Sequence, residues 1–366
     1  MKKSNFTATR YGLRRPLRFA KLAAWQREAP RTTPLAQRLD MWRRGYRASA
    51  YEYDLSPGAS ENYLPDSSRL DIAFIDGPFA RSVLNDKLLF TELVGGVLEV
   101  PPVVALIERG EVYPVYAEGR TLTLKELVCD HRSLILKPVG GRHGRGVHRL
   151  ELKRELSPEL NSELNSDLDP SLHLDARPVS CAEVDDFSRT LDRYIVTPTV
   201  KQAAYARTIC AETTNGVRVM TFVNPDTREP FVGYALHRFG TPATQPTDNW
   251  ARGGLCCHVD LSDGSLGPGL KQPRWTGGKA VFRTHHPDSG AALGGVRIPR
   301  WLGLCEGLLG AVEAFPFLLY VGWDVVVTDG GFVVLEGNTN SDLLQLGGGI
   351  LKDPRVRRFY EYHGVI

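Results

Sequence analysis

The chain has 366 residues, which is enough for a large core divided between two or three domains or lobes. Hydrophobic residues make up 42% of the chain and charged residues 24%, values typical of a soluble globular protein. The formal net charge is +3, but residues 1–50 hold 13 Lys and Arg against two acidic residues, and the other 316 residues hold 32 basic and 40 acidic ones. A basic amino-terminal segment thus precedes a mildly acidic body.

This basic segment has more than one interpretation. Its charge suits nucleic acid, an anionic surface or a polyanionic substrate. A helical arm with solvated Lys and Arg is the preferred interpretation, because few aromatic residues accompany the charges and no DNA- or RNA-binding motif is present. The segment is also poor in acidic residues, as transit peptides are, but nothing else in the sequence supports import.

Secretion, membrane insertion and a zinc site find no support. The basic start continues into polar sequence, so we expect no secretory signal. The most apolar stretch, residues 301–323, contains Glu306, Glu313 and Pro316, which argue against a membrane span. The cysteines lack paired zinc-site spacings, and we expect reduced thiols in a cytoplasmic protein; they are Cys129, Cys181, Cys210, Cys256, Cys257 and Cys305.

The predicted elements alternate between helix and strand along the chain. The apolar run at residues 70–75 predicts a strand or a buried segment, and residues 85–98 predict a helix with Asp86 and Lys87 in its first turn. Further predicted strands cover residues 103–107, 134–138, 194–196, 217–223, 231–236, 325–327 and 332–335. Further predicted helices cover residues 122–128, 181–191 (opened by a capping box of Ser180 and Glu183) and 301–315.

Turn signals complete the fold prediction. Residues 151–170 contain a short polar repeat without a packing face, which predicts a mobile loop or an extended hairpin. The sequence Thr-Asp-Gly-Gly at residues 328–331 predicts a tight hairpin between the last two strands. Antiparallel hairpins mixed with helices indicate an α+β fold and not a doubly wound sheet.

A glycine-rich loop follows the strand at residues 134–138. Residues 136–147 read Leu-Lys-Pro-Val-Gly-Gly-Arg-His-Gly-Arg-Gly-Val. The backbone N–H groups of such a loop can surround phosphate oxygens, and basic side chains can add charge. The spacing matches neither a P-loop nor a dinucleotide fingerprint, so a tight solvated turn is an equally good explanation of the loop alone. The candidate phosphate-binding residues are Lys137, Gly140, Gly141, Gly144, Gly146, and Arg142 or Arg145.

Three oxygen-bearing residues lie on the last predicted hairpin. Asp324 is on its first strand, and Glu336 and Asn338 lie two apart near the end of its second. Oxygen donors grouped in this way suit Mg²⁺, which takes phosphate and water as its other ligands. A turn-flanking acid and an Asn cap are the alternative, but carboxylates beside buried apolar runs need compensation, so we favour the metal site.

Arg218 occupies an otherwise apolar predicted strand, where an unpaired cation would be unfavourable. A phosphate, a carboxylate substrate or a structural salt bridge would satisfy it equally well. Residues 247–254, Thr-Asp-Asn-Trp-Ala-Arg-Gly-Gly, form a second polar motif that carries Asn249 and Arg252.

Taken in order, these motifs resemble those of the ATP-grasp superfamily, and most closely its sugar-transfer associated branch, which is related to glutamate-ligase-like enzymes. The resemblance covers about residues 80–350. The motifs that carry it are Asp86-Lys87, Lys137-Pro138 with the glycine loop, residues 215–221, residues 248–254, and Gly322-Trp323-Asp324 with Glu336-Gly337-Asn338; His286-Pro287 and residues 298–301 also resemble this branch.

The resemblance implies that two α+β lobes enclose ATP. Lys87 and Lys137 would then approach the phosphates, and the loop at residues 140–146 would close over them. The metal ligands would be Asp324, Glu336 and Asn338, and Arg218 would meet the γ-phosphate or an acyl phosphate, with Asn249 and Arg252 nearby. Adenine would lie against the strand that ends at Val196. Relatives usually carry Gln or Glu just after this strand, whereas this chain has Thr197 and Pro198, and so departs from the family at the position expected to contact the ribose.

The activity implied by the resemblance is ATP-dependent carboxylate–amine ligation through an acyl phosphate, with release of ADP and phosphate. The substrates would be a small-molecule carboxylate and an amine. The alternatives are a kinase that phosphorylates a small-molecule hydroxyl, or an inactive nucleotide- or nucleic-acid-binding module. The expected divisions are residues 1–75 for the basic extension and pre-grasp region, 76–200 for the first lobe, and 201–366 for the second lobe with the Mg²⁺ site.

Overall fold

The computed structural model describes residues 34–47, 60–115, 122–141, 145–153, 172–277, 280–339, 341 and 344–366. The strands in this part of the chain form two seven-stranded sheets, and all their pairings are antiparallel. The predicted α+β fold is therefore confirmed. Most of the polar repeat at residues 151–170 and the first 33 residues lie outside the described residues.

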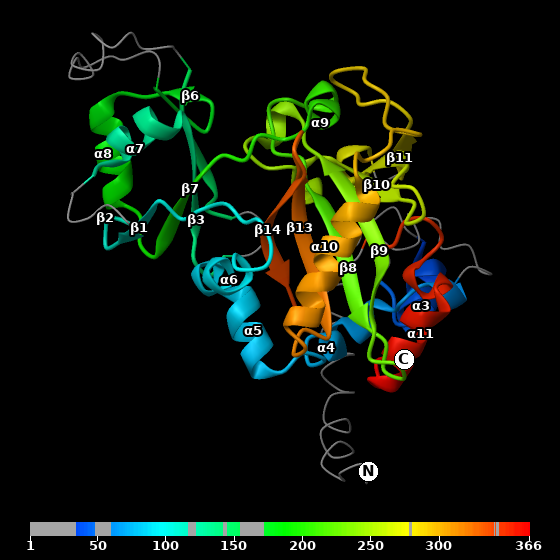
Figure 1. Ribbon diagram of the computed structural model, residues 1–366. Coiled ribbons are helices and arrows are strands. Elements are labelled where there is room, and N and C mark those ends of the chain that lie inside the picture. Colours follow the sequence, from blue (N-terminus) through cyan, green and yellow to red (C-terminus); the bar gives the residue numbers. More distant parts are fainter. Residues whose placement is uncertain are drawn as a thin grey trace.

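The first sheet forms a small lobe, seen at the left of Figure 1. Its strand order is β2-β1-β7-β3-β4-β5-β6, with β1 (Ala105–Glu108), β2 (Glu111–Pro114), β3 (Ser133–Pro138), β4 (His148–Leu152), β5 (Leu172–Leu174), β6 (Arg177–Pro178) and β7 (Tyr194–Pro198). Helices α7 (Leu124–His131) and α8 (Cys181–Arg189) pack against the face that buries Leu134, Leu136 and Val196. The alternate residues, including Lys137 and Ile195, lie on the opposite face.

The second sheet is the centre of the large lobe. Its strand order is β12-β11-β10-β9-β8-β13-β14, with β8 (Val217–Val223), β9 (Pro230–Phe239), β10 (Leu255–Val259), β11 (Leu266–Lys271), β12 (Val281–Arg283), β13 (Tyr320–Val327) and β14 (Phe332–Asn338). Val217 and Val219 pack with α10 (Trp301–Ala314) on one face, and Met220 and Phe222 pack with α11 (Pro354–Tyr362) on the other. By this alternation Arg218 lies on the α11 face.

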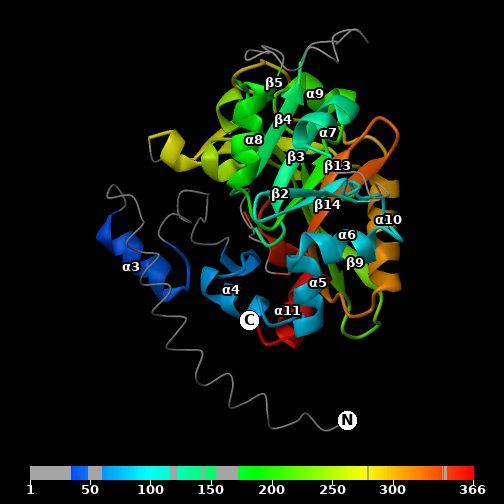
Figure 2. The same cartoon turned by 90° about the vertical axis from the view of Figure 1, so that its left-hand side faces the viewer.

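Helices α5 (Pro78–Asn85) and α6 (Lys87–Val94) precede the small lobe in the chain but pack on the large lobe (Figure 2). Leu84 and Phe90 approach the backbone of Gly337 on β14 so closely that a Cβ there would lie 2.7 Å and 3.1 Å from their side chains. The expected division at residue 76 groups these helices with the first lobe, whereas their buried side chains belong to the core of the second.

The segment before α5 and the carboxyl-terminal segment also lie together on the large lobe. The side-chain amide of Gln345 accepts a hydrogen bond from Leu64 N at 2.6 Å and donates one to Leu64 O at 2.8 Å. Helix α3 (Leu35–Arg43) adjoins this region, because the Tyr46 hydroxyl that follows it donates to Tyr63 O at 2.8 Å. Helix α9 (Ala204–Ile209) follows β7 and leads into β8.

Most predicted elements are present; of the two alternatives for residues 70–75 the strand is excluded, whereas Ile72 is buried as the other alternative expects. The capping box is confirmed, since Glu183 N donates to Ser180 Oγ at 3.2 Å and Ser180 N to Glu183 Oε2 at 2.8 Å. The predicted final hairpin is confirmed as β13 and β14. The run at residues 70–75 is not a strand but lies in α4 (Arg69–Ile72) and the turn after it. All six cysteines are free, and no helix among the described residues has the length and apolar character needed to cross a membrane.

Candidate functional site

The β13–β14 hairpin brings the three predicted magnesium ligands together. Asp324 pairs with Glu336 and Gly322 with Asn338, so the three oxygen-bearing side chains lie on one face of the sheet. The Asn338 amide donates to Glu336 Oε1 at 3.3 Å. Within the described ranges no group of three His, Cys, Asp or Glu side chains is placed to hold a metal ion. A metal at this position would therefore rely on two carboxylates and an amide.

Two arginines hold Asp324. Arg218 Nε and Nη2 donate to the two carboxylate oxygens, the latter at 2.9 Å, and Arg238 Nη2 lies 3.4 Å from Oδ1. Burial alone would raise the pKa of Asp324, but both guanidinium groups outweigh that effect and hold it below its usual range. Arg218 also donates to the hydroxyl of Ser341. In this state the cation of Arg218 is satisfied by a salt bridge, one of the alternatives left open by its position on an apolar strand.

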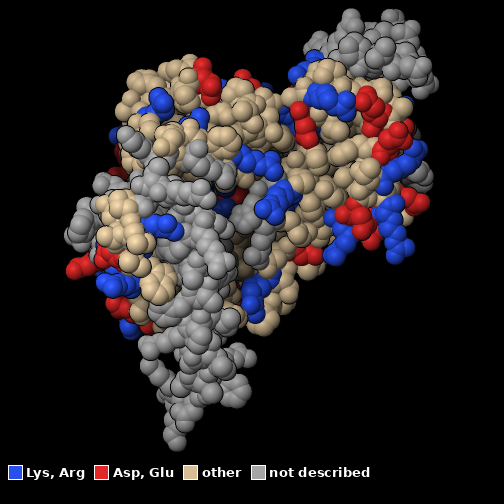
Figure 3. All heavy atoms as spheres, turned by 180° about the vertical axis from the view of Figure 1, so that it is seen from behind, with Lys and Arg blue, Asp and Glu red and all other residues tan. Residues whose placement is uncertain are grey.

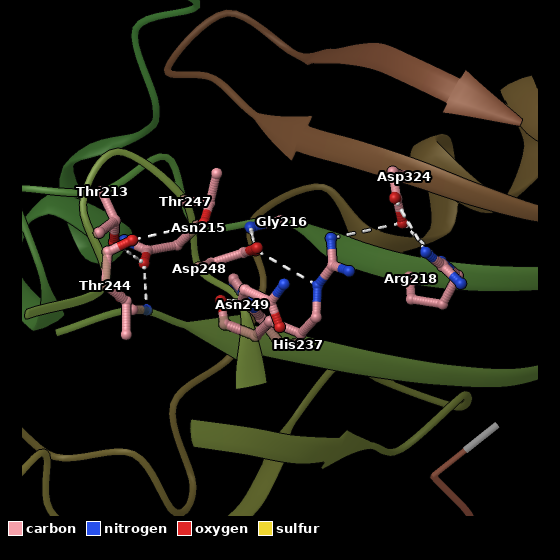
Figure 4. Close-up of polar contacts among 12 residues, drawn as sticks. Thr213, Asn215, Gly216, Arg218, His237, Thr244, Thr247, Asp248, Asn249 and Asp324 are labelled. Atoms are coloured by element: carbon pink, nitrogen blue, oxygen red, sulfur yellow. Dashed lines mark hydrogen bonds and ion pairs between the residues drawn. The ribbon is translucent and has the colours of Figure 1, made fainter. Parts of the chain in front are cut away.

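Arg238 was missed by the sequence analysis. It lies on β9, one strand from Arg218, and joins Asp324 to Asp248, whose Oδ2 is 3.3 Å from Arg238 Nε. The same Asp248 oxygen accepts a hydrogen bond from Gly216 N at 2.7 Å, which Figure 4 shows as a dashed line. The available signal was an arginine in an apolar strand, the same signal that identified Arg218.

Asn249 and Arg252 belong to the turn after Asp248. Asn249 Oδ1 accepts from Ala251 N at 2.8 Å and so caps the short 3₁₀ helix Trp250–Arg252. Arg252 is exposed and forms no ion pair with another described residue. The turn ends at Gly253, whose φ of 116° favours glycine. Of this motif, Asp248 is the residue in contact with the Arg218–Asp324 pair through Arg238.

Lys87 and Lys137 meet the hairpin from the other side. Lys87 Nζ donates to Gly141 O at 2.9 Å and lies 3.7 Å from Glu336 Oε2. Lys137 Nζ donates to Leu335 O at 3.5 Å. Burial lowers the pKa of Lys137 to about 8; Glu336 opposes this shift and Lys87 adds to it. The ammonium groups of Lys87 and Lys137 therefore lie near the carboxylate of Glu336.

The glycine loop is described at both of its ends. Gly140 and Gly141 follow β3 after Val139. Gly146 has a φ of 69°, and a Cβ on it would lie 2.6 Å from the Tyr194 hydroxyl. Glycine is therefore required at Gly146 by both conformation and space. Arg142 and Gly144, which were also predicted to bind phosphate, lie outside the described residues.

Val196 does not point into the space between the lobes. Its side chain is fully buried in the small-lobe core, and its carbonyl accepts from Val104 N at 2.9 Å. Ile195 pairs with Lys137 across β7 and β3, and Thr197 is on the same face. The residues of this strand that face the large lobe are thus Ile195 and Thr197.

The lobes together enclose a charged hollow. In Figure 3, which views the molecule from behind, a depression lies between the lobes, with basic side chains at its rim and acidic atoms deeper inside. The contacts above bring four basic and three acidic side chains to this region: Lys87, Lys137, Arg218, Arg238, Asp248, Asp324 and Glu336. A polyanion that arrives with a divalent cation would balance both signs of charge.

Several solved structures are similar to this chain at low sequence identity. The ATP-grasp ligase PsnB complexed with its minimal precursor is 14% identical with a TM-score of 0.37, and the alignment covers 77% of this chain and 62% of that one. D-alanine–D-alanine ligase from Bacillus anthracis is 12% identical with a TM-score of 0.38, covering 79% of this chain and 69% of that one. D-alanyl-alanine synthetase A from Vibrio cholerae is 9% identical with a TM-score of 0.39, covering 79% and 63%.

The chain spans about three fifths of the length of the PsnB structures that it matches. No curated protein matches it. A family model described as sugar-transfer associated ATP-grasp matches residues 74–353, which is well over half of the chain and includes both sheets and every residue of the charged hollow. The chain belongs to the sugar-transfer associated ATP-grasp family.

Proposed function

We propose that this protein is an ATP-dependent carboxylate–amine ligase that forms an amide or peptide-like bond and releases ADP and phosphate. The observation that carries the proposal is the meeting of Lys87 and Lys137 with Glu336 at the junction of the two lobes, beside the Arg218–Asp324 pair. In an ATP-grasp chain this is where the phosphates of ATP would bind.

The donor set fits magnesium. Asp324 and Glu336 face each other on paired strands, Asn338 lies beside Glu336, and Glu336 is partly exposed toward the hollow. Two carboxylates and an amide leave coordination positions for phosphate oxygens and water, which is the usual mode of Mg²⁺ binding in nucleotide sites. When bound, the ion would neutralise phosphate charge and polarise the transferred phosphoryl group.

The basic residues have separate roles. Lys87 begins α6 and donates to Gly141 of the glycine loop, Lys137 lies on β3 just before that loop, and both would neutralise phosphate charge. Arg218 and Arg238 lie on the large-lobe sheet and would hold the substrate carboxylate and the transferred phosphoryl group. Because their guanidinium groups are already fixed by Asp324 and Asp248, they need little reorganisation when charge develops in the transition state.

Each step then has a chemical role for the site. A carboxylate oxygen attacks the γ-phosphorus, the bond to ADP breaks, and an acyl phosphate forms. The amine nitrogen attacks the acyl carbon, phosphate leaves, and the nitrogen loses a proton. Activation is required because a free carboxylate has no acceptable leaving group. The exposed Arg252 and the capping Asn249 at the edge of the site are our candidates for contact with the acceptor.

The test is a screen of carboxylate and amine pairs with ATP and Mg²⁺, read by product mass. Hydroxylamine in place of the amine should trap the acyl phosphate as a hydroxamate, and ADP and phosphate should form in equal amounts. Glu336→Gln should abolish formation of the ligation product and of the hydroxamate. Glu361→Gln, a substitution at an exposed position on α11, should abolish neither. Ligation with release of AMP and pyrophosphate would disprove the mechanism, and a phosphorylated product without an amine would identify a kinase.

A further inference from the structure

Arg149 on β4 crosses from the small lobe to the large lobe. Its Nη1 donates to the carbonyl oxygen of Glu212 at 3.1 Å, and its Nη2 donates to Gln245 Oε1 at 3.4 Å. The side chain is only 14% exposed, and Glu151 Oε2 lies 3.8 Å from Nη2. One guanidinium group thus contacts two separate turns of the opposite lobe. The proposed ligase reaction assigns no role to this residue.

Both turns lead directly to residues of the charged hollow. The first, with Glu212, continues through Gly216 into β8 and Arg218. The second, with Gln245, continues to Asp248. A parallel bridge between Thr214 and Thr247 joins the turns, and Gly216 N donates to Asp248, as seen in Figure 4. A displacement of either turn would therefore move the Arg218–Asp324–Arg238–Asp248 chain.

Buried hydrogen bonds hold the backbone next to the Glu212 acceptor of Arg149. Asn215 is 1% exposed, and its Nδ2 donates to Gln202 Oε1 at 2.9 Å and to Cys210 O at 2.7 Å. Its Oδ1 accepts from Gly240 N at 3.0 Å. Gln202 in turn donates to Thr213 O at 2.7 Å. These buried bonds fix the backbone around Glu212, because breaking them would leave buried polar groups unsatisfied.

The strand that presents Arg149 is equally fixed. Arg149 N donates to Asp175 Oδ1 at 2.8 Å, and Asp175 N donates to Arg149 O at 2.9 Å. The second oxygen of Asp175 is 2.7 Å from Nδ1 of His148. The guanidinium therefore joins the two lobes, which the chain itself links at residues 95–104, between α6 and β1, and at residues 199–203, between β7 and α9.

We propose that Arg149 is a positioning residue that aligns the small lobe, with Lys137 and the glycine loop, to the turns that lead into Arg218 and Asp248. This inference rests on the proposed nucleotide site between the lobes. A guanidinium suits the role because its planar fork donates to two acceptors at once in a fixed geometry, which a lysine ammonium on a flexible stem does not.

The experiment compares Arg149→Ala, Arg149→Lys and the control Arg189→Ala with the wild-type protein. Arg189 is a small-lobe arginine that is 70% exposed, and its ion pair among the described residues is with Asp186 on its own helix, at 2.7 Å. Two readouts are used: hydrogen exchange of the nucleotide-free protein at residues 211–216 and 241–248, and calorimetric binding of AMP-PNP with Mg²⁺. Thermal melting of each variant shows that it is folded.

Arg149→Ala is expected to speed exchange at both turns and to weaken AMP-PNP binding about tenfold, as for a lost charge-assisted hydrogen bond. Arg149→Lys should recover part of both effects, and Arg189→Ala should change neither. Unchanged exchange, or faster exchange with unchanged affinity, would overturn the role of Arg149. If the wild-type protein binds no AMP-PNP, the proposed function fails, and the exchange data alone then decide whether Arg149 couples the lobes.

Discussion

Asp324 and Glu336 face each other across one hairpin but differ in their surroundings. Asp324 is buried between Arg218 and Arg238, whereas the side chain of Glu336 is 30% exposed and contacts Lys87 at 3.7 Å. Asp324→Ala should therefore lower the free energy of unfolding by about 3–5 kcal/mol, because it leaves buried guanidinium groups unpaired. Glu336→Ala should lower it by less than about 1 kcal/mol.

Urea unfolding of the two variants, with magnesium-dependent turnover measured in parallel, separates these effects. Both substitutions should abolish turnover, but only Asp324→Ala should shift the unfolding midpoint strongly. Equal midpoints would contradict the structural role assigned to the Asp324 salt bridges, and retained turnover in both variants would remove the metal-ligand assignment.

For Lys137, removal of the charge is expected to weaken MgATP binding without lowering the stability of the fold. Its ammonium is buried, and burial is the main reason that its pKa falls to about 8. Lys137→Met keeps the length of the side chain and removes the charge, so the unfolding midpoint should stay equal or rise. Affinity for MgATP should fall roughly ten- to a hundredfold, the value of one charge-assisted phosphate contact. Calorimetry and thermal melting on the same samples test both statements, and a stability loss with unchanged affinity would contradict them.

For single residues, the sequence was a better guide to which side chains belong to the site than to which residues they contact. Strand alternation and hairpin pairing bring Asp324, Glu336 and Asn338 to one face, whereas Lys87 reaches Glu336 from a helix that packs on β14. Arg238 was missed because the predicted strand 231–236 ended two residues before it, whereas β9 extends to Phe239. Val196 was assigned to the cleft, and this was wrong. Ile195 pairs with Lys137 and shares its face of the sheet, so Ile195 and Thr197 face the cleft and Val196, between them, faces the core.

Helix α5 and the turn before it depend on one buried carboxylate. Asp76 Oδ1 accepts from Leu319 N and Tyr320 N, each at 3.2 Å, while its Oδ2 is buried without a hydrogen-bond partner among the described residues. Burial raises the pKa of Asp76 to about 7, against the opposing effect of the two backbone donors and of Arg81. The folded protein therefore binds the proton more tightly than the unfolded chain does.

Stability should consequently fall as pH rises from about 4 to about 7, by a contribution on the order of 3–5 kcal/mol, and Asp76 should add no further change above that range. Asp76→Asn should remove this contribution and be the more stable protein at pH 8. Chemical unfolding of both proteins at pH 5 and pH 8 measures it. If the free energies of unfolding of wild type and Asp76→Asn differ by the same amount at pH 5 and pH 8, Asp76 is not the titrating group.

The elements that were predicted well are those with a strong local signal. The capping box at Ser180 and the Thr-Asp-Gly-Gly turn specify where a helix begins and where a hairpin reverses. Residues 70–75 lacked such a signal: a short apolar run fits a buried helical turn as well as a strand, and Ile72 is buried in either case. Tertiary contacts with α11 and β13, which a local pattern does not contain, decided the outcome.

On the scale of the whole molecule, the two ends of the described chain are joined through Gln345. Its side-chain amide bonds both backbone groups of Leu64, as a neighbouring strand would: Oε1 accepts from Leu64 N at 2.6 Å and Nε2 donates to Leu64 O at 2.8 Å. Gln345→Ala should lower the free energy of unfolding by about 1–3 kcal/mol and expose residues 60–65 to proteases. Limited proteolysis with mass mapping tests this. Gln345→Glu serves as a control that keeps one acceptor but loses the donor, so its effect should be intermediate.

The order of the elements along the chain has a further consequence for synthesis on the ribosome. The small-lobe strands lie between residues 105 and 198, so this sheet is complete before any strand of the second sheet has emerged. Helices α5 and α6 are made earlier still, yet Leu84 and Phe90 find their partner Gly337 only when β14 appears. We therefore expect the nascent chain to carry a folded small lobe while the apolar faces of α5 and α6 stay uncovered during the synthesis of about 250 further residues. These two helices are where we expect a chaperone to bind first.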